Sequence, residues 1–486
     1  MSPDSAPRPN FHICVIGGGV VGLAGGILFR SQGLRVTILE RDAALHTLHP
    51  NAVRVLQDIG VYDKVRSRSV VPLSIILKAY KTGEVLHVQD LLEPADRYGA
   101  PLLTLHRAHL RQLLYDEAIA QGVTVRHGVS VDPAGIDLTN GVLHLSNPDE
   151  TFHADLFVGA DGGHSVVREA LTGRKPRAIP HGKVVNRLLI DERAISARPH
   201  LRYLVEQPNI VVWLGPECQA VTYGLDGTYN VAFTWPWSSD PEDVFFGPQP
   251  VNLADFWAEL GAWDPDLREL VSLGTSCARW MFFEPEIDGD ETPWVDAAGR
   301  FCLVGDAAHR GLPYLLLENC LFYCLSPPFT AVCLNHNVWL IIDAFSPVFS
   351  SRGQGAATGI ESVSVLAHLL GKAVAEYDDG DDGRRRVMVG DALDIYQRLR
   401  KERTAHVTRA TLKTGRLWQM PDGPLKDERD RELLRETGNP SVGYPNPLAD
   451  PFFQRWLWGF DAPEAADRAW AAYRRGDVAG RGQLGS

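Results

Sequence analysis

The segment 12–40 constrains the fold of this chain more than any other part of the sequence. It consists of a short apolar run, a glycine-rich turn, a segment of helical character and a second β-type run that ends on Glu40. Three glycines of the turn, Gly17, Gly19 and Gly22, fit a G-x-G-x-x-G pattern. This order of elements predicts the first strand–helix–strand unit of a doubly wound α/β fold.

Each residue of this pattern has a physical task in a dinucleotide site. Gly17 permits the tight turn, Gly19 lets a pyrophosphate approach the backbone, and Gly22 lets the helix pack closely on the strand. The N–H groups and the dipole at the helix start favour phosphates, and Glu40 at a strand end is placed to accept hydrogen bonds from a ribose. The alternative is a strand–turn–helix corner without a ligand, but the complete context favours the dinucleotide site.

The length and composition exclude several other classes of protein. A chain of 486 residues suggests about two or three domains. The net charge of −12 argues against a nucleic-acid surface, because phosphate binding needs clustered Lys and Arg. The polar start has no apolar signal-peptide core, and the seven Cys show neither a disulfide framework nor metal-ligand spacing. We therefore expect a soluble, cytoplasmic, metal-free protein with no nucleic-acid partner.

The segment 315–351 differs from its surroundings, since it has no Lys or Arg and holds three of the seven Cys. A membrane helix is one interpretation, but Pro327-Pro328 and Asn335-His336-Asn337 interrupt every window of adequate length. A structured lid is a second. We favour a third, an insertion foreign to the fold such as a translated intron, because the motifs on either side form one interrupted unit. Sequencing of mature transcripts would test this hypothesis.

Four separated motifs resemble one family, the class A flavoprotein monooxygenases, and within it the fungal branch similar to salicylate hydroxylase. The motifs are the 17–40 fingerprint with Arg41, His106-Arg107-Ala108-His109-Leu110, Gly159-Ala160-Asp161-Gly162, and Gly305-Asp306-Ala307-Ala308-His309 joined to 352–357. The resemblance covers nearly the whole chain apart from 315–351. Four motifs in the right order are specific evidence for the family, whereas any one of them alone would be modest evidence.

The resemblance implies that FAD is the cofactor and NAD(P)H the co-substrate. It implies that Glu40 binds the adenosine ribose, that Arg107 contacts the phosphate and ribityl region, and that Asp306 hydrogen-bonds the ribityl chain. Gly355 and Ala356 would lie under the flavin ring at a helix N-terminus, whose dipole favours the anionic reduced flavin. A separate motif linked to both FAD and NAD(P)H contains Asp161.

The resemblance also implies two catalytic residues, Arg187 and Tyr223. A phenolate reacts better than a phenol with an activated oxygen, and arginine is a permanent cation able to hold it. The tyrosine could orient the same oxygen by hydrogen bonding. The alternatives are that Arg187 is only a surface partner on a sheet and that Tyr223 is a core aromatic with its hydroxyl at the rim.

Together these observations predict a Rossmann-like, doubly wound, FAD-binding α/β domain that is discontinuous in sequence. An inserted antiparallel β-sheet would bind the substrate, and a helical extension would end the chain. The expected ranges are 1–75, 100–183 and 296–400 for the FAD-binding domain, 76–99 and 184–295 for the substrate domain, and 401–486 for the extension.

The implied reaction is the hydroxylation of an aromatic, phenolic or polyketide-derived small molecule with NAD(P)H and O2, in fungal secondary metabolism. One alternative is a non-catalytic FAD-fold protein produced by anomalous splicing. Two segments that lie beside the flavin in the family are affected here: 42–49 is too short to hold the first, and 315–351 interrupts the second. Another is a flavin halogenase, but the W-x-W-x-I-P stretch typical of that class is not found, and Trp235-Pro236-Trp237 lacks the rest.

Overall fold

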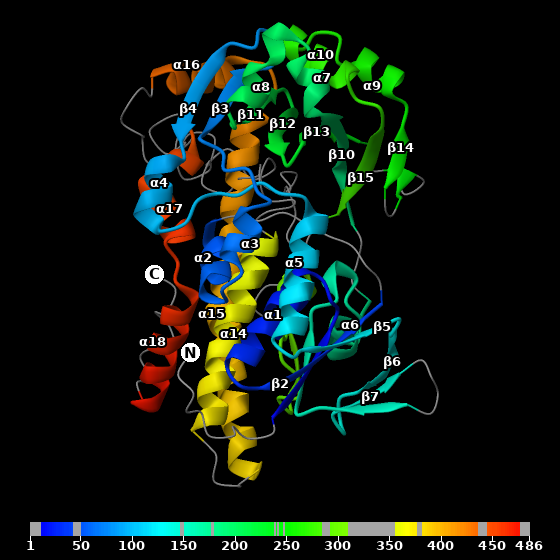
Figure 1. Ribbon diagram of the computed structural model, residues 1–486, viewed down its shortest axis with the longest axis vertical. Helices are drawn as coiled ribbons and strands as arrows, with labels where there is room; N and C mark the ends of the chain where they lie inside the picture. Colours follow the sequence, from blue (N-terminus) through cyan, green and yellow to red (C-terminus); the bar gives the residue numbers. More distant parts are fainter. Residues whose placement is uncertain are drawn as a thin grey trace, which may run out of the picture.

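The structure, a computed structural model, describes residues 11–41, 50–145, 150–175, 179–237, 240, 243–245, 248–283, 292–309, 355–376, 382–435 and 445–476. A parallel sheet with its helices lies in the lower half of Figure 1, and an eight-stranded sheet lies in the upper half. The long helix α15 (Asp382–Trp418) runs through both halves.

The lower sheet is parallel throughout, with the strand order β16-β9-β1-β2-β5. Its strands are β1 (His12–Ile16), β2 (Arg35–Glu40), β5 (Thr124–His127), β9 (Leu156–Gly159) and β16 (Phe301–Leu303). All residues of β1 and β9 are buried, as expected for central strands covered on both faces. A small antiparallel sheet adjoins it, made of β6 (Val131–Asp137), β7 (Val142–Leu145) and β8 (Thr151–His153).

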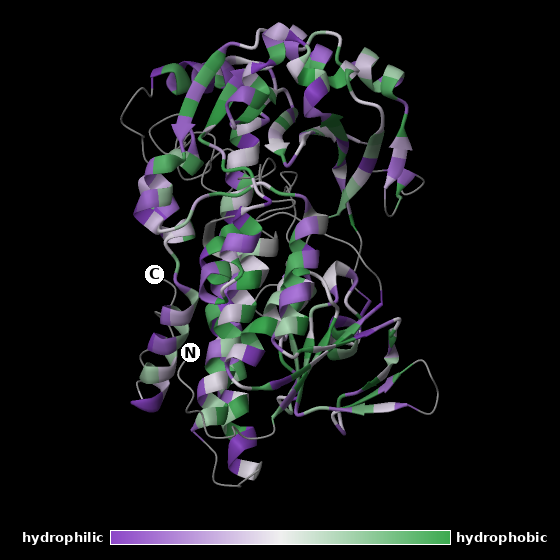
Figure 2. Cartoon of the chain, viewed as in Figure 1, coloured by the Kyte–Doolittle hydropathy of each residue, from purple (hydrophilic) through white to green (hydrophobic). Residues whose placement is uncertain are grey.

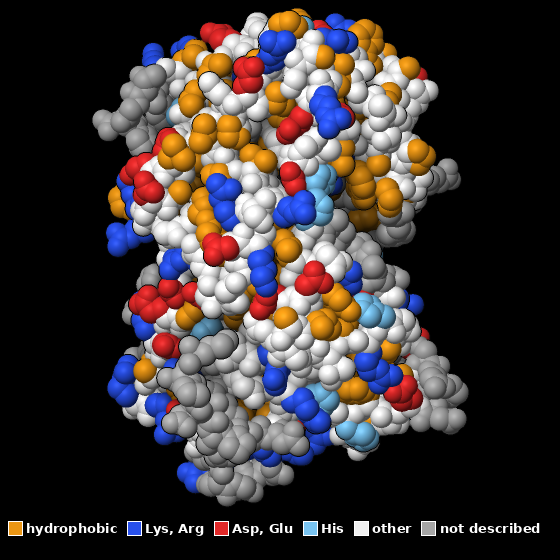
Figure 3. Space-filling model, in the orientation of Figure 1, with side chains coloured by type: hydrophobic (Ala, Val, Ile, Leu, Met, Phe, Trp, Pro, Cys, Tyr) orange, Lys and Arg blue, Asp and Glu red, His pale blue; other side chains and the backbone are white. Residues whose placement is uncertain are grey.

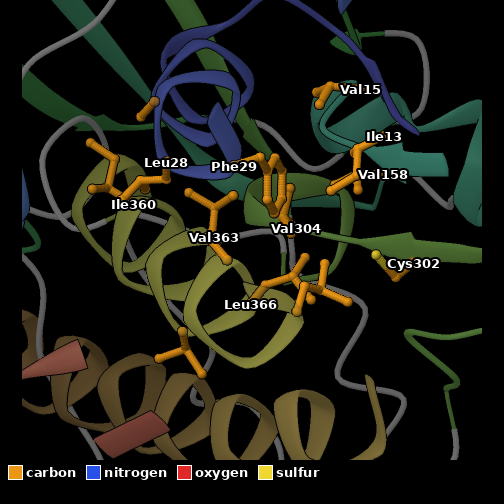
Figure 4. Packing of buried hydrophobic residues seen from close by; sticks show 14 of the residues in the cluster. Ile13, Val15, Leu28, Phe29, Val158, Cys302, Val304, Ile360, Val363 and Leu366 are labelled. Carbon is orange, nitrogen blue, oxygen red and sulfur yellow. The ribbon is translucent and has the colours of Figure 1, made fainter. Parts of the chain in front are cut away.

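The main core forms where two helices, α1 (Val20–Ser31) and α14 (Gly355–Ala375), pack on this sheet. The helices approach closely at Gly25, where an added Cβ would lie 2.6 Å from Cγ2 of Val363. Figure 2 shows hydrophobic residues along both helices, and Figure 4 shows the packing in detail. The labelled core residues are Leu28 and Phe29 from α1, Ile360, Val363 and Leu366 from α14, Ile13, Val15, Val158 and Cys302 from the sheet, and Val304 directly after β16.

The upper sheet has the strand order β14-β15-β10-β13-β12-β11-β3-β4. Its strands are β3 (Ser74–Ala79), β4 (Val85–Asp90), β10 (Pro180–Asp191), β11 (Ile210–Gly215), β12 (Cys218–Leu225), β13 (Thr228–Pro236), β14 (Gln249–Val251) and β15 (Cys277–Phe283). Neighbours pair antiparallel except β3 with β11, which are parallel. This exception is allowed because a long connection through the lower half separates β3 from β11 in sequence.

Short helices and the helical C-terminal region complete the described structure. Helices α7 (Glu192–Ser196), α8 (Tyr203–Glu206), α9 (Leu253–Glu259) and α10 (Pro265–Ser272) lie over the upper sheet in Figure 1. The other helices are α2 (Pro50–Asp58), α3 (Tyr62–Arg66), α4 (Leu92–Tyr98), α5 (Arg107–Ala120), α6 (Val166–Thr172), α16 (Pro424–Arg435), α17 (Pro451–Trp458) and α18 (Ala462–Arg474). The 3₁₀ turns are η1 (Gly162–His164), η2 (Pro199–Leu201), η5 (Gly305–Ala307) and η7 (Pro447–Ala449).

A buried ion-pair network joins α14 to α15. Glu361 of α14 accepts hydrogen bonds at 2.8 Å from Arg400 Nη2 and from Arg403 Nε and Nη2, and the three side chains are 1%, 0% and 6% exposed. Arg403 also donates to the backbone carbonyls of Trp456 and Leu457, both in α17. One buried carboxylate therefore links α14 to α15, and Arg403 in turn links α15 to α17.

The predicted architecture is confirmed: a doubly wound domain, an inserted sheet and a helical C-terminal region are all present. The exact domain ranges stay a prediction, and segments 42–49 and 315–351 lie outside the described residues. Among described residues, no helix is long and apolar enough to cross a membrane, and no cluster of three His, Cys, Asp or Glu could hold a metal. On the face shown in Figure 3, positive and negative side chains are interspersed.

Candidate active site

Three of the predicted motifs follow the carboxyl ends of neighbouring parallel strands. In the register of β1, β9 and β16, Gly159 pairs with both Ile16 and Leu303. The turn at Gly17, the segment at Asp161 and the turn at Gly305 therefore begin at one edge of the sheet. Ligands of doubly wound proteins bind at this edge.

The glycine turn after β1 has the geometry that its sequence predicts. Gly17 has φ of +106°, and an added Cβ would lie 2.5 Å from the carbonyl oxygen of Ala160. At Gly22 an added Cβ would lie 1.9 Å from the carbonyl oxygen of Gly17, so only glycine lets α1 pack on the turn. Gly19 is the N-cap of α1, and no atom lies within 4 Å of its Cβ direction. A ligand can therefore approach the backbone here.

Glu40 is held in place beside this turn. Its side chain is buried, and Oε2 accepts a hydrogen bond of 2.5 Å from the backbone N–H of Gly18. Arg111 of α5 donates from Nε to the carbonyl oxygen of Gly18 at 2.8 Å, and its Nη2 lies 3.9 Å from Glu40 Oε2. Arg111 is a site residue that the sequence reasoning missed. Arg107, the predicted contact, is the first residue of α5, and its side chain lies outside the described part.

The second glycine-lined helix start lies directly beside the first. Gly305 has φ of +60°, and its Cβ direction meets Cγ2 of Val21 in α1 at 3.2 Å. At Gly359, in the first turns of α14, an added Cβ would lie 2.6 Å from the same Val21 atom and 3.2 Å from Cα of Gly305. The first turns of α1 and α14 and the turn that carries the exposed Asp306 therefore meet at one place.

Helix α14 begins at Gly355, so Gly355 and Ala356 form its first residues as predicted. Asp161, by contrast, has an evident structural task. Its Oδ2 accepts hydrogen bonds from the backbone N–H groups of Val166 at 2.8 Å and Val167 at 3.4 Å. Burial raises the pKa of this carboxyl group, which the local hydrogen bonds partly offset. Its predicted role toward FAD and NAD(P)H stays a prediction.

The two predicted catalytic residues share one face of the upper sheet. Arg187 of β10 pairs with Ala232 of β13, and Tyr223 of β12 pairs with Asn230 of β13. Directly paired residues, and residues two apart on one strand, point to the same face. Both side chains therefore border Asn230, whose Oδ1 accepts a 2.6 Å hydrogen bond from Arg187 Nε.

This face adjoins α5 of the lower domain near Thr228, and near Tyr223 it packs against α15 and α17, whereas the opposite face is covered by α9 and α10. Leu188 and Val231, the neighbours of Arg187 and Asn230 in sequence, pack in a core with residues of α9 and α10. On the face of Asn230, His106 at the start of α5 hydrogen-bonds Thr228 Oγ1 at 2.9 Å. Burial, then the charges of His109 and Arg187, lowers the pKa of His106.

The fold and site together define a nucleotide-binding, doubly wound α/β protein with a second sheet joined at its ligand edge. Comparisons with known proteins agree. Residues 10–222 match the family model described as FAD binding domain. The FAD-dependent monooxygenase OpS4 of Beauveria bassiana is 28% identical, over 95% of this chain and 98% of that protein. The 3-hydroxybenzoate 6-hydroxylase of Klebsiella oxytoca is 28% identical, over 83% of this chain and 88% of that protein.

Solved structures show the same fold. A salicylate hydroxylase in complex with its substrate superposes with a TM-score of 0.68 at 18% identity, over 95% of this chain and 98% of that one. CtdE in complex with FAD and substrate superposes with a TM-score of 0.70 at 16% identity, over 96% of this chain and 98% of that one. The chain therefore carries an FAD-binding domain over residues 10–222, with FAD as its cofactor, and it is similar over nearly its whole length to FAD-dependent monooxygenases.

Replacing Glu40 with alanine is expected to weaken FAD binding by about 10- to 100-fold, since a carboxylate that accepts ribose hydrogen bonds contributes on the order of 1.5–3 kcal/mol. The ratio of flavin to protein absorbance after purification, and the Kd for FAD, measure the loss. The matched control is Glu84→Ala in the exposed turn between β3 and β4. Equal FAD content in the two variants would remove Glu40 from the cofactor site.

Proposed function

We propose that this chain hydroxylates an electron-rich aromatic or polyketide-derived ring with NAD(P)H and O2, and that Arg187 and Tyr223 hold the ring. The observation that carries the proposal is their common sheet face. There they border one buried residue, Asn230, next to the segment that opens α5 of the cofactor domain. The names of the relatives favour the same substrate class, since 3-hydroxybenzoate and 3-amino-4-hydroxybenzoate are phenols.

In this proposal the protein contributes binding, orientation and exclusion of water. Bound FAD supplies the redox and oxygen chemistry. The guanidinium of Arg187 stays charged at every relevant pH and stabilises a substrate phenolate. The hydroxyl of Tyr223 orients the same oxygen. Val185 and Phe282, together with Ala232 and Trp280, form an apolar cluster beside Arg187 that keeps water from the ring.

The test uses the purified full chain in three measurements. Visible absorbance reports bound flavin, consumption of NADH and of NADPH reports reduction, and mass spectrometry of a phenol panel reports addition of one oxygen atom derived from labelled O2. The panel includes 3-hydroxybenzoate, 3-amino-4-hydroxybenzoate and hispidin. A yellow protein that consumes neither nicotinamide with any phenol would favour the non-catalytic alternative, and a chlorinated product formed in chloride buffer would favour the halogenase.

A further inference from the structure

Two arginine–asparagine pairs lie on opposite faces of the upper sheet. Each pair has one member in β10, and these two members, Asn186 and Arg187, are neighbours in sequence. Asn230 Oδ1 accepts from Arg187 Nε at 2.6 Å, and Asn186 Oδ1 accepts from Arg279 Nε at 2.7 Å. Both asparagines are 0% exposed, and the Nδ2 group of each has no hydrogen-bond partner among the described residues. The pairs match in residue type, burial and bond length, but they differ in what surrounds them.

The Asn186 pair belongs to the helix-covered side. Asn186 pairs across the sheet with Phe233, whose ring packs on Phe256 of α9, and Arg279 stacks on Trp237 at 4.4 Å. The Asn230 pair faces the cofactor domain instead. Tyr223 lies directly across from it in the sheet register, and Thr228, two residues earlier on the same face, contacts His106.

A buried amide N–H without a partner costs about 1–3 kcal/mol, so a ligand that accepts from such a group is favoured where the surroundings suit one. On the cofactor side the unpartnered Nδ2 of Asn230 adjoins a cation. Arg187 donates a hydrogen bond from Nε to Asn230, and that is its one side-chain hydrogen bond found among the described residues. Amide and guanidinium donors together suit an anionic oxygen, because hydrogen bonds to a charged acceptor are the strong ones.

We propose that Asn230 has two tasks in substrate recognition: its Oδ1 fixes the guanidinium of Arg187, and its Nδ2 donates a hydrogen bond to an anionic oxygen of the substrate. The ligand class is therefore an aromatic phenolate or carboxylate. This inference rests on the proposed function, since it places the substrate on the same sheet face. It adds a residue that neither the motifs nor the resemblance indicates.

The test compares Asn230→Asp with Asn186→Asp in the FAD-loaded protein. Aspartate keeps the oxygen that accepts from arginine but replaces the Nδ2 donor with a second acceptor, which repels an anion. The probes are 3-hydroxybenzoate and its neutral analogue 3-hydroxybenzamide, and their Kd values come from changes in flavin absorbance. We expect Asn230→Asp to weaken benzoate binding by about 10- to 100-fold relative to benzamide, the effect of one charged hydrogen bond.

Asn186→Asp also introduces a buried carboxyl group, but on the opposite face of the sheet. It should therefore alter Tm without changing the ratio of the Kd for 3-hydroxybenzoate to the Kd for 3-hydroxybenzamide. Asn230→Leu, which also removes the acceptor for Arg187, should lower kcat in addition to weakening binding. An unchanged ratio in Asn230→Asp, or a wild-type protein that binds the benzoate no more tightly than the benzamide, would overturn the proposal. Because Kd is measured without turnover, failure of hydroxylation alone is distinguishable from failure of this assignment.

Discussion

Replacing Arg187 with alanine is expected to lower kcat/KM for hydroxylation by about 100-fold or more, while FAD content stays constant. The loss is of the size seen when one preorganised group that stabilises developing charge is removed. Arg187 lies in the upper sheet, away from the glycine turn and Glu40 that would hold the adenosine half of FAD. Steady-state kinetics with a phenolic substrate, together with the flavin-to-protein absorbance ratio, measure both quantities.

The control is Arg279→Ala, which removes the arginine of the equivalent pair on the helix-covered face. That variant should lose stability comparable to Arg187→Ala but keep most of its turnover. Unchanged turnover in Arg187→Ala would remove this residue from the site. A common fall in FAD content in both variants would indicate that the sheet itself had been disturbed.

Replacing Glu361 with glutamine is expected to lower the free energy of unfolding by about 3–5 kcal/mol, because it leaves two buried guanidinium groups without their counter-ion. The carboxylate accepts from both Arg400 and Arg403, and none of the three side chains is more than 6% exposed. Denaturant unfolding at saturating FAD, followed by far-UV circular dichroism, measures the change.

Glu432→Gln serves as the control, since Glu432 also pairs with an arginine on a helix but at the surface. Its partner Arg435 is 69% exposed, and their separation is 2.6 Å. Exposed pairs contribute less than about 1 kcal/mol, so this variant should unfold almost as the wild type does. If the two glutamine variants proved equally stable, Glu361 would not be the residue that holds α14 against α15.

The adenosine side of the site could be predicted because its parts are neighbours in sequence. Gly17, Gly19 and Gly22 lie in one turn between a strand and a helix, and that local geometry follows from glycine's lack of a Cβ. Arg111 was missed, although it follows Arg107 by one helical turn and therefore lies on the same helix face. That spacing is the signal that could have identified it.

The substrate side could not be predicted to the same depth. Arg187, Tyr223 and Asn230 come from three strands, and their proximity depends on strand register, which a single sequence specifies poorly. Asn230 stands in an ordinary alternating strand with no motif around it. The Glu361 network was equally hidden, because it depends on which faces of two long helices meet. Tertiary packing decided both.

The length of helix α15 affects how the protein unfolds. At about 1.5 Å per residue, its 37 residues form a rod of about 56 Å. Leu393 and Tyr396 lie in the core beneath the parallel sheet, and Trp418 lies in a core of the upper sheet. Each half needs this shared helix to complete its hydrophobic core. The two halves should therefore unfold as one cooperative unit, and either half expressed alone should expose apolar surface instead of folding independently.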